Sequence, residues 1–516
     1  MQRPIVYLIG AGPGDPGLLT LRGRECLEQA DFILYDQLVS PRLLEFAPVT
    51  AETMCVREMA NTHPDRWPYI HVKLIEEARK GKCVVRLKGG DPLIFGRGGE
   101  EAEALREAGI PYEIVPGVTA ALAAGSYLEI PLTHRSLSSA VAFITGHEHP
   151  GKPSSRIDWK AVAAFPGTLV IYMGFSRLAS IVPELMLQGK APDTPAAAIS
   201  HATTGEQQTV ISTLGKLEES IRAAGLTTPA LIIIGPVVGL KPALSWFEAR
   251  PLLGQRVLVT RPRHQATELL HQIELLGAIP HLLSALEIRP PADWSPVDAA
   301  QEKMRQGGFD WLVFTSSNGI DMFLKRLFER GHDLRDLGSI KLAAIGKATA
   351  DKLREYHLQP DIVPAETMNS ERLFSELKSR VEGKNILIAQ ADRGRELLRV
   401  ELARMAHVAV VSVYSQVDTV DPKSEVFDLL RRGEIDFITL TSPNIAKALL
   451  KCCDQTILDR LHRGEIRIVT SNPRTSAAVK DHGLPVAGEA IDPTNAALID
   501  ALRVREKVSG TFVNGS

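Results

Sequence analysis

Two glycine-rich segments in the first half of this 516-residue chain carry residue types that could hold a flat ligand. Residues 9–17 read Ile-Gly-Ala-Gly-Pro-Gly-Asp-Pro-Gly, after a strand-like run and before a helix expected from about Leu18. Residues 88–91 read Lys-Gly-Gly-Asp. Adjacent glycines let a ligand approach the backbone, and Asp91 can accept a hydrogen bond from a hydroxyl or an amine. A glycine pair alone is typical of a tight turn, but four further segments favour a binding site. They are Pro116–Ala121, Ile130–Arg135, Phe143–His147 and Tyr172–Gly174.

The first of these segments superficially matches a dinucleotide-binding fingerprint. Its first two glycines fit that pattern, and Asp36 at the end of the next expected strand would then be the ribose-binding acid. However, Asp15 stands at the third glycine position, and Pro13 and Pro16 remove two N–H donors. The segment is therefore a poor pyrophosphate cradle, and a nicotinamide-dependent oxidoreductase is the disfavoured alternative. It could still form a rigid floor against a flat ligand.

Composition indicates an ordinary globular protein with about three or four compact units. Hydrophobic residues make up 44% and charged residues 23%, and the formal charge of −2 argues against a nucleic-acid partner. The longest apolar runs are too short to span a bilayer, and the N-terminus does not resemble a signal peptide. We therefore expect a cytoplasmic protein without a membrane partner. Five cysteines without CxxC spacing are expected to be free thiols.

A metal site is not expected. The histidines at 147 and 149 in Gly-His-Glu-His are not followed by further ligands at a helical or hairpin spacing.

Short apolar runs alternate with helical stretches along the chain, which predicts α/β domains with mainly parallel sheets. In the second half, residues 309–318 resemble 435–444, and residues 340–349 resemble 466–475 at the same spacing. This repeat predicts two similar α/β lobes, each with a Thr-Ser loop after a central strand. Because ligands bind at the carboxyl ends of strands in open parallel sheets, we expect both loops to face one cleft.

From about Pro4 to Leu240 the chain resembles uroporphyrinogen-III C-methyltransferases, which use S-adenosylmethionine (SAM) and release S-adenosylhomocysteine. The resemblance implies the tetrapyrrole-methylase fold, with SAM bound between two α/β lobes. It implies that Asp36, in Tyr-Asp-Gln-Leu-Val-Ser, is the catalytic base. It also implies cofactor contacts at Pro13, Gly89, Gly90, Asp91, Ile94, Thr119, Ala120, Met173 and Ala202.

One departure from the family pattern matters most for the chemistry. Where the family usually has a lysine with an assigned acid role, this chain has Glu58. Either the lysine is dispensable, or the neighbouring Arg57 supplies the positive charge, or this half has impaired or altered activity. We favour the first two together. Arg57 would then bind substrate carboxylates and not act as an acid, because a guanidinium does not readily lose a proton.

From Gly254 to about Arg503 the chain resembles uroporphyrinogen-III synthase, which cyclises hydroxymethylbilane with inversion of the last pyrrole. The motifs are Val257–Pro262, Phe314–Asn318, Ala344–Ala350, Ala391–Glu396, Val413–Tyr414 and Leu440–Asn444. The resemblance implies two flavodoxin-like lobes with a hinge near 286 and 416, and it places a proton donor at Tyr414. Hydroxyls and guanidinium groups suited to substrate carboxylates are Arg261, Thr315, Ser316, Thr349, Arg393, Arg395, Ser442 and Thr475. Taken singly, the serines and threonines could equally be turn or N-cap residues.

These expectations combine into a bifunctional enzyme, because the product of the second half is the substrate of the first. Hydroxymethylbilane would become uroporphyrinogen III, which would be methylated twice to precorrin-2. The methyltransferase resemblance further implies a homodimer formed through the first half. The expected organisation is a methyltransferase over 1–245, a linker over 246–253, a synthase over 254–505 and a disordered tail over 506–516.

Overall fold

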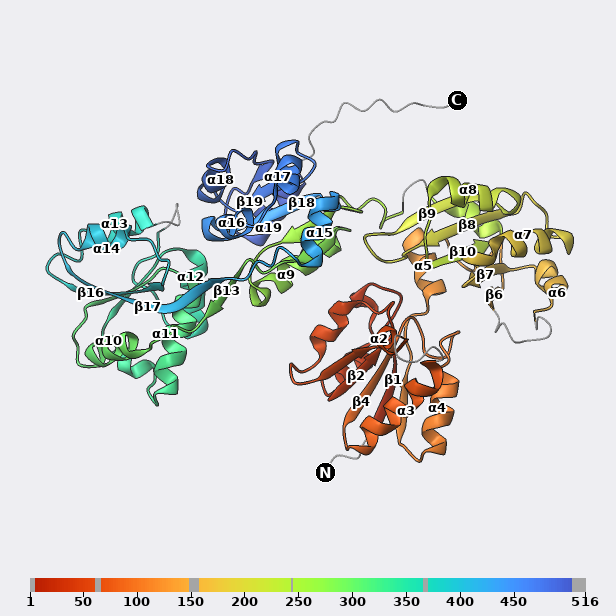
Figure 1. Ribbon diagram of the computed structural model, residues 1–516, viewed down its shortest axis with the longest axis horizontal. Coiled ribbons are helices and arrows are strands. Elements are labelled where there is room, and N and C mark those ends of the chain that lie inside the picture. Colours follow the sequence, from red (N-terminus) through yellow and green to blue (C-terminus); the bar gives the residue numbers. More distant parts are fainter. Residues whose placement is uncertain (1–4, 61–65, 148–156, 243–244, 365–369, 504–516) are drawn as a thin grey trace. The chain divides into compact units, whose positions relative to one another are not determined.

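The computed structural model describes residues 5–60, 66–147, 157–242, 245–364 and 370–503 (Figure 1). The expected tail over 506–516 and the histidine at 149 therefore lie outside the described residues. The chain forms two compact units. The first contains residues 1–256 and 271–280, and the second contains residues 257–270 and 281–516.

The first lobe of the first unit is built on a parallel sheet with strand order β3-β2-β4-β1-β5. The strands are β1 (Ile5–Gly10), β2 (Phe32–Tyr35), β3 (Glu52–Cys55), β4 (Cys83–Lys88) and β5 (Tyr112–Val115). The helices are α1 (Leu21–Leu27), α2 (Val56–Ala60), α3 (Arg66–Arg79) and α4 (Gly98–Glu107).

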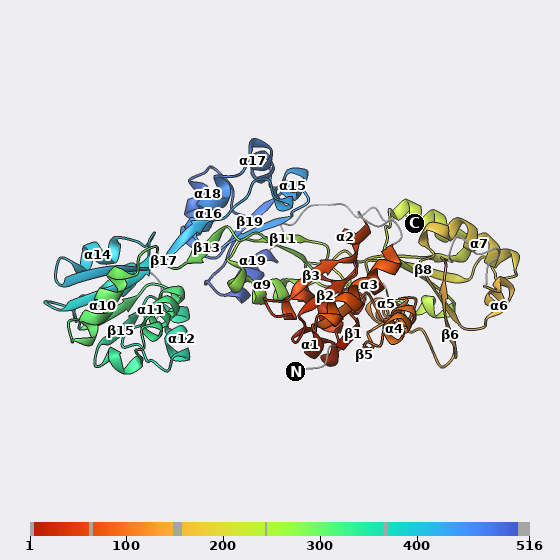
Figure 2. The ribbon, with the colours of Figure 1, turned by 60° about the horizontal axis from the view of Figure 1, so that its bottom comes forward.

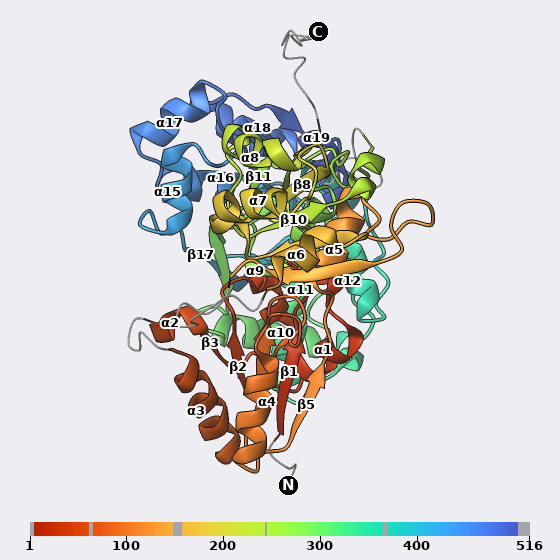
Figure 3. The same cartoon turned by 90° about the vertical axis from the view of Figure 1, so that its right-hand side faces the viewer.

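Both faces of this sheet are covered, which explains why its central strands are continuously apolar. Figure 3 shows α3 and α4 on one side of β1 and α1 on the other, in agreement with two separate hydrophobic clusters. The helix expected from Leu18 starts slightly later. A short 3₁₀ turn over Pro16–Leu18 comes first, and α1 follows with Thr20 as its N-cap.

The second lobe departs from the expected mainly parallel arrangement. Its sheet has the order β6-β7-β10-β8-β9, and within the described residues only β6 and β7 pair in parallel. A short loop over residues 201–207 joins β8 to β9, and a connection of this length suits an antiparallel pair. The strands are β6 (Val141–Thr145), β7 (Thr168–Tyr172), β8 (Pro195–Ser200), β9 (Gln208–Thr213) and β10 (Ala230–Ile234).

Helices cover both faces of this second sheet as well. Helix α5 (Ala120–Leu128) follows the first lobe and packs on one face, and three helices pack on the other. These three are α6 (Trp159–Ala164), α7 (Leu178–Leu187) and α8 (Leu217–Ala224).

Two further lobes follow along the chain, each with its own sheet, and most of their residues belong to the second unit. One sheet is parallel from β11 through β18 and β19 to β20, with β12 at the other edge of β11. Its strands are β11 (Arg256–Val259), β12 (Ile279–Leu282), β18 (Phe437–Leu440), β19 (Arg467–Thr470) and β20 (Gly488–Glu489). Its helices are α9 (Arg263–Leu275), α15 (Glu425–Arg432), α16 (Pro443–Leu450), α17 (Gln455–His462), α18 (Pro473–Lys480) and α19 (Asn495–Leu502).

The other lobe has the strand order β13-β17-β16-β14-β15, with helices on both faces of the sheet. Its strands are β13 (Leu286–Arg289), β14 (Trp311–Phe314), β15 (Lys341–Ala344), β16 (Asn385–Ala391) and β17 (His407–Asp418). Its helices are α10 (Ser295–Arg305), α11 (Ser317–Glu329), α12 (Lys347–Glu355), α13 (Ser370–Leu377) and α14 (Leu397–Leu402).

The chain passes between these two lobes through β13 and β17, which pair antiparallel from Leu286–Asp418 to Arg289–Ser415 (Figure 2). The internal repeat corresponds to the same structure in each lobe. A central strand (β14 or β18) ends in a Thr-Ser loop, and the serine caps the following helix (α11 or α16). The fold is thus α/β throughout, with two lobes in each unit.

Candidate active sites

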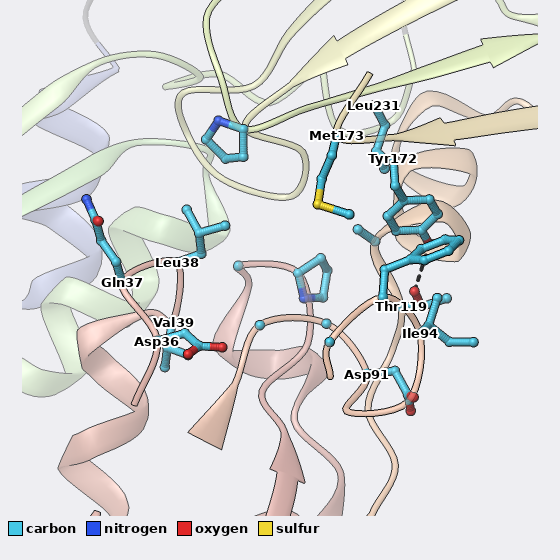
Figure 4. Close-up of a pocket in the computed structure, with 18 of the residues that line it drawn as sticks. Asp36, Gln37, Leu38, Val39, Asp91, Ile94, Thr119, Tyr172, Met173 and Leu231 are labelled. Atoms are coloured by element: carbon cyan, nitrogen blue, oxygen red, sulfur yellow. Dashed lines mark hydrogen bonds between the residues drawn. The ribbon is translucent and has the colours of Figure 1, made fainter. Parts of the chain in front are cut away.

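A cleft of about 1740 Å³ lies between the two lobes of the first unit (Figure 4). The first lobe contributes the loops after β1, β2 and β4. The second lobe contributes the end of β7, the start of β10 and the loop between β8 and β9. Every candidate residue of the first half lines this cleft. They are Pro13, Asp36, Arg57, Gly89, Gly90, Asp91, Ile94, Thr119, Ala120, Met173 and Ala202.

The two glycine-rich segments meet directly at the floor of the cleft. Gly12 and Gly90 exchange backbone hydrogen bonds of 3.2 and 2.8 Å. A Cβ on Gly117 would lie 2.3 Å from the Gly90 carbonyl oxygen, so that a side chain cannot be accommodated between them. Gly10 and Gly117 are therefore required because backbone segments cross in direct contact there, whereas Gly12 and Gly90 have positive φ angles that favour glycine.

Asp91 already accepts two backbone hydrogen bonds. The N–H of Leu93 donates to one carboxylate oxygen at 2.9 Å, and the N–H of Gly117 donates to the other at 3.0 Å. Because each carboxylate oxygen has two lone pairs, Asp91 retains acceptor capacity for a ligand while its orientation is fixed.

The space above Gly89 and Gly90 fits a bulky ligand such as SAM. A Cβ on Gly89 would meet only the Leu38 Cβ, at 3.7 Å, so its missing side chain leaves room at the cleft. Ile94 and Met173 offer apolar surface, being 37% and 47% exposed. Met173 has a left-handed φ of 52°, a conformation that is strained for methionine and typical of binding sites.

Asp36 is held by a buried group of charged residues. Arg86 on β4 donates to the Asp36 carboxylate, and its Nε donates to Glu101 Oε1 at 3.0 Å. Lys88 Nζ donates to the same Glu101 oxygen at 2.8 Å. The side chains of Arg86, Lys88 and Glu101 are at most 1% exposed, whereas that of Asp36 is 31% exposed. The network thus presents one carboxylate to the cleft.

The charges in this network balance when all four groups are ionised. Burial acts to lower the pKa of Arg86, but the charges of Asp36 and Glu101 raise it overall. Burial and the charge of Arg86 lower the pKa of Lys88. Sequence reasoning overlooked Arg86, Lys88 and Glu101. The sequence did contain a signal for the two cations. Arg86 interrupts the otherwise apolar run Val84–Leu87, and Lys88 follows that run directly.

Tyr172 is a further residue that sequence reasoning did not single out within its motif. Its hydroxyl hydrogen-bonds Thr119 Oγ1 at 2.7 Å and accepts from the N–H of Ala121 at 2.9 Å (Figure 4). Burial raises the pKa of the Tyr172 hydroxyl, which therefore stays protonated. Tyr172 thereby positions Thr119 and Ala120 at the start of α5, both of which line the cleft.

Glu58, which stands at the family's lysine position, and its neighbour Arg57 lie in different surroundings. Arg57, in the first turn of α2, lines the cleft, whereas Glu58 is exposed and is not among the lining residues. This placement supports the interpretation that Arg57 supplies the positive charge.

Arg57→Ala is expected to raise the KM for the tetrapyrrole about three- to tenfold, because an exposed guanidinium–carboxylate contact is worth only about 1 kcal/mol. The SAM dissociation constant should stay unchanged. Steady-state methylation kinetics and isothermal titration calorimetry measure the two quantities, and Glu58→Ala is the matched control. An unchanged tetrapyrrole KM in Arg57→Ala would exclude this role.

In the second unit, the structure brings together Tyr414 on β17 and Ser316 at the N-terminus of α11. Their hydroxyls lie 3.0 Å apart, and Ser316 Oγ also accepts from the N–H of Gly319 at 3.0 Å. Tyr414 is 4% exposed, and burial raises the pKa of its hydroxyl, which keeps it protonated. Ser316 is thus both a helix cap and a partner of the candidate proton donor.

The other candidates of the second half divide into two kinds. Arg393 and Arg395 are half-exposed and form ion pairs with Asp418 and Glu371 at 2.6 and 2.8 Å. The Arg261 guanidinium donates a hydrogen bond to the side-chain oxygen of Asn495, and burial lowers the pKa of this guanidinium. The four hydroxyl candidates lie in loops or in the first turns of helices. Two of the threonines are buried, and the serine is a helix N-cap. The four are Thr315, Thr349 (4% exposed), Thr475 (0% exposed) and Ser442, the N-cap of α16.

Comparisons with known proteins divide the chain in the same way. Residues 5–218 match the model of the tetrapyrrole (corrin/porphyrin) methylases, and residues 267–500 match the model of uroporphyrinogen-III synthase HemD. The porphyrin biosynthesis protein HemD of Ruminiclostridium josui is 36% identical over 487 residues, which cover 94% of this chain and 95% of that protein. The SAM-dependent uroporphyrinogen III methyltransferase of Methanosarcina barkeri is 46% identical, over 46% of this chain and 94% of its own length.

Solved structures also resemble each half. The uroporphyrin-III C-methyltransferase of Thermus thermophilus, complexed with S-adenosylhomocysteine, is 41% identical, with a TM-score of 0.39 and coverage of 46% of this chain and 93% of its own. A uroporphyrinogen III synthase from the same species is 18% identical, with a TM-score of 0.37 and coverage of 48% and 97%.

The lobed α/β units and the cleft lined by family motifs define a SAM-dependent tetrapyrrole methyltransferase joined to a lyase. The chain belongs to the family of tetrapyrrole methylases fused to uroporphyrinogen-III synthase. It is a bifunctional enzyme of tetrapyrrole biosynthesis with SAM as its cofactor. In the described parts of the chain, every helix is too short or too polar to span a bilayer, and three or more His, Cys, Asp or Glu side chains are nowhere grouped as metal ligands.

Proposed function

We propose that the first half methylates uroporphyrinogen III twice to give precorrin-2, and that the second half forms uroporphyrinogen III from hydroxymethylbilane. The observation that carries the methylation proposal is the convergence of all eleven candidate residues on one cleft. Pockets for a single small ligand usually measure about 300–1,000 Å³. The cleft of about 1740 Å³ offers room for a cofactor and a tetrapyrrole together.

The residues of the cleft divide the work of methyl transfer. The loop residues and apolar side chains near Gly90 would hold SAM, whose sulfonium supplies an electrophilic methyl group. Arg57 would bind acetate or propionate groups of the macrocycle. Asp36 would accept the proton that the pyrrole loses after the new carbon–carbon bond has formed. The hydrogen bond from the buried Arg86 would keep the Asp36 carboxylate in place during both transfers.

In the second half, Tyr414 would donate a proton to the leaving hydroxyl of hydroxymethylbilane. The arginine and hydroxyl candidates would hold the substrate's carboxylates so that the inverted ring closure is favoured over direct closure. The contact between Tyr414 and Ser316 supports this role, because it directs the phenol of a buried tyrosine toward a loop at the carboxyl end of β14.

Tyr414→Phe is expected to slow formation of the III isomer about tenfold, below the ~10²–10⁴-fold usual for a general acid, because an electron-rich pyrrole expels hydroxide readily. Spontaneous closure to the I isomer should then dominate the products. Isomer analysis by chromatography after oxidation measures the ratio. Tyr356→Phe is the matched control, since the Tyr356 hydroxyl donates to Asp321 at 2.9 Å elsewhere in the same lobe. Full III-isomer turnover in Tyr414→Phe would remove Tyr414 from the mechanism.

One experiment tests the whole proposal and its alternatives. The protein is mixed with hydroxymethylbilane and SAM, and the precorrin-2 chromophore is followed together with S-adenosylhomocysteine release. Two equivalents of S-adenosylhomocysteine per precorrin-2 are expected. Uroporphyrinogen III without methylated product would instead indicate an impaired methyltransferase half.

A separate thermal-shift measurement compares the two candidate cofactors. A rise in melting temperature with NAD and none with SAM would favour the nicotinamide alternative.

We also propose that the chain forms a homodimer through its first half. The support is the methyltransferase resemblance. Light scattering coupled to gel filtration should give twice the chain mass, and a monomer mass at micromolar concentration would contradict the proposal.

A further inference from the structure

The segment over residues 246–253, which we expected to be a linker, begins with two aromatic residues that pack against α5. Phe247 is 1% exposed, and its ring lies 4.8 Å from that of Tyr127. Trp246 lies 5.0 Å from the same ring, and its indole N–H donates to the Ser126 carbonyl oxygen at 3.2 Å. Arg250 completes the cluster, with its guanidinium carbon 4.4 Å from the centre of the Phe247 ring. These contacts place the segment within the first compact unit, which extends to residue 256.

A buried ion pair fixes the segment at its start. Lys241 Nζ lies 2.6 Å from Glu248 Oε2, and the two side chains are 6% and 14% exposed. The same Glu248 oxygen accepts from the N–H of Ser245 at 3.0 Å. The segment that carries the aromatic cluster is therefore held by an ion pair and a backbone hydrogen bond as well as by contacts between rings.

Tyr127 connects this cluster to the loop after β1. Its hydroxyl donates to Asp15 Oδ2 at 2.6 Å, and the other Asp15 oxygen accepts from the N–H of Gly17 at 2.7 Å. The N–H of Asp15 in turn donates to Thr203 Oγ1 at 3.0 Å. Asp15 thus joins the loop over residues 12–17 in the first lobe to the loop over residues 201–204 in the second.

Both of these loops line the cleft, through Gly12, Pro13 and Gly14 on one side and His201, Ala202 and Thr204 on the other. They are tightly packed, since a Cβ on Gly14 would lie 2.8 Å from Thr204 Cγ2. His201 and Thr203 have positive φ angles of 48° and 73°. Such backbone conformations persist only when surrounding contacts hold them.

We propose that Tyr127, on α5 and packed against the Trp246–Phe247 segment, is a positioning residue that holds these two loops in the SAM-binding conformation. The segment over residues 245–250 is then a functional part of the methyltransferase. This inference rests on the proposed assignment of the cleft as the SAM site. Tyr127 itself is not among the residues that line the cleft, so its effect is exerted through Asp15.

The test uses the full-length chain and compares SAM binding, methylation kinetics and synthase activity. Tyr127→Phe removes only the hydroxyl and keeps the ring in place. We expect SAM to bind about five- to tenfold more weakly, because part of a charge-assisted hydrogen bond's contribution is lost from the loop. The tetrapyrrole KM should change less than twofold, and cyclisation of hydroxymethylbilane should stay unchanged. Phe247→Leu should show a smaller loss of SAM affinity in the same direction.

Tyr112→Phe is the matched control, since the Tyr112 hydroxyl accepts from Arg106 at 2.9 Å in an exposed part of the first lobe of the same unit. SAM affinity in Tyr127→Phe within twofold of the unaltered protein would overturn the inference. Equal losses of SAM and tetrapyrrole affinity would also overturn it, because they indicate general destabilisation. If the unaltered protein binds SAM but Asp91→Ala binds it equally well, the assignment of the cleft fails, and the inference fails with it.

Discussion

An Asp36→Asn variant is expected to methylate uroporphyrinogen III about 10²–10⁴-fold more slowly than the unaltered protein, the range in which a general base usually contributes. Asparagine keeps the size of the side chain and can still accept a hydrogen bond from Arg86, but it cannot take up a proton. SAM affinity should be nearly unchanged, because the methylated carbon and not the cofactor loses the proton. Single-turnover methyl transfer, measured with saturating SAM, gives the rate of this step.

The control for this prediction is Asp31→Asn. Asp31 precedes the same strand, β2, and its carboxylate accepts from the N–H of Cys83 at 2.8 Å at the opposite end of the sheet. A loss of methylation in both variants would indicate damage to β2 and not removal of a base. A rate within tenfold of normal for Asp36→Asn would assign proton removal to another group or to water.

Glu101→Gln is expected to destabilise the first unit by about 3–5 kcal/mol, the usual cost of removing one partner from a buried ionic network. Glu101 is fully buried, and one of its oxygens accepts from both Arg86 and Lys88. The neutral amide leaves two buried cations with Asp36 as the only remaining anion of the network. Urea-dependent hydrogen exchange, read by mass spectrometry at peptides from β4 and α4, measures the loss within the full chain.

The matched control here is Glu103→Gln, on the exposed side of the same helix. It should change the unfolding free energy by less than about 0.5 kcal/mol, as is usual for an isolated surface substitution. Comparable stabilities of the two glutamine variants would show that the network contributes little to folding. Because Arg86 also contacts Asp36, Glu101→Gln should in addition slow methylation at urea concentrations where the protein remains folded.

The fold class and the residues of the first cleft were predictable because their signals are local. Glycine at 10 and 117 reflects backbone contacts that exclude a side chain, glycine at 12 and 90 reflects positive φ angles, and these requirements are visible in the residue type itself. The internal repeat of the second half likewise predicted two lobes with matching Thr-Ser loops, since a strand followed by a capped helix is encoded in a short stretch.

Contacts between distant segments could not be predicted in the same way. Arg86 and Lys88 were visible as cations in an apolar strand, but only the packing of α4 on that strand shows that Glu101 neutralises them. The antiparallel pairing of the second sheet was missed because strand direction depends on how connections cross the sheet, which a single strand's composition does not record.

The sequence alone therefore determined which families the chain belongs to, and it predicted residues that line the cleft of the first unit. These properties reside in residue type and short-range spacing. Only the tertiary structure decided that Asp36 is anchored by a buried arginine, and that Trp246 and Phe247 pack against Tyr127 on α5 and do not form a free linker. Both arrangements depend on burial, which gives a charge or an aromatic ring its partner only after the segments have come together.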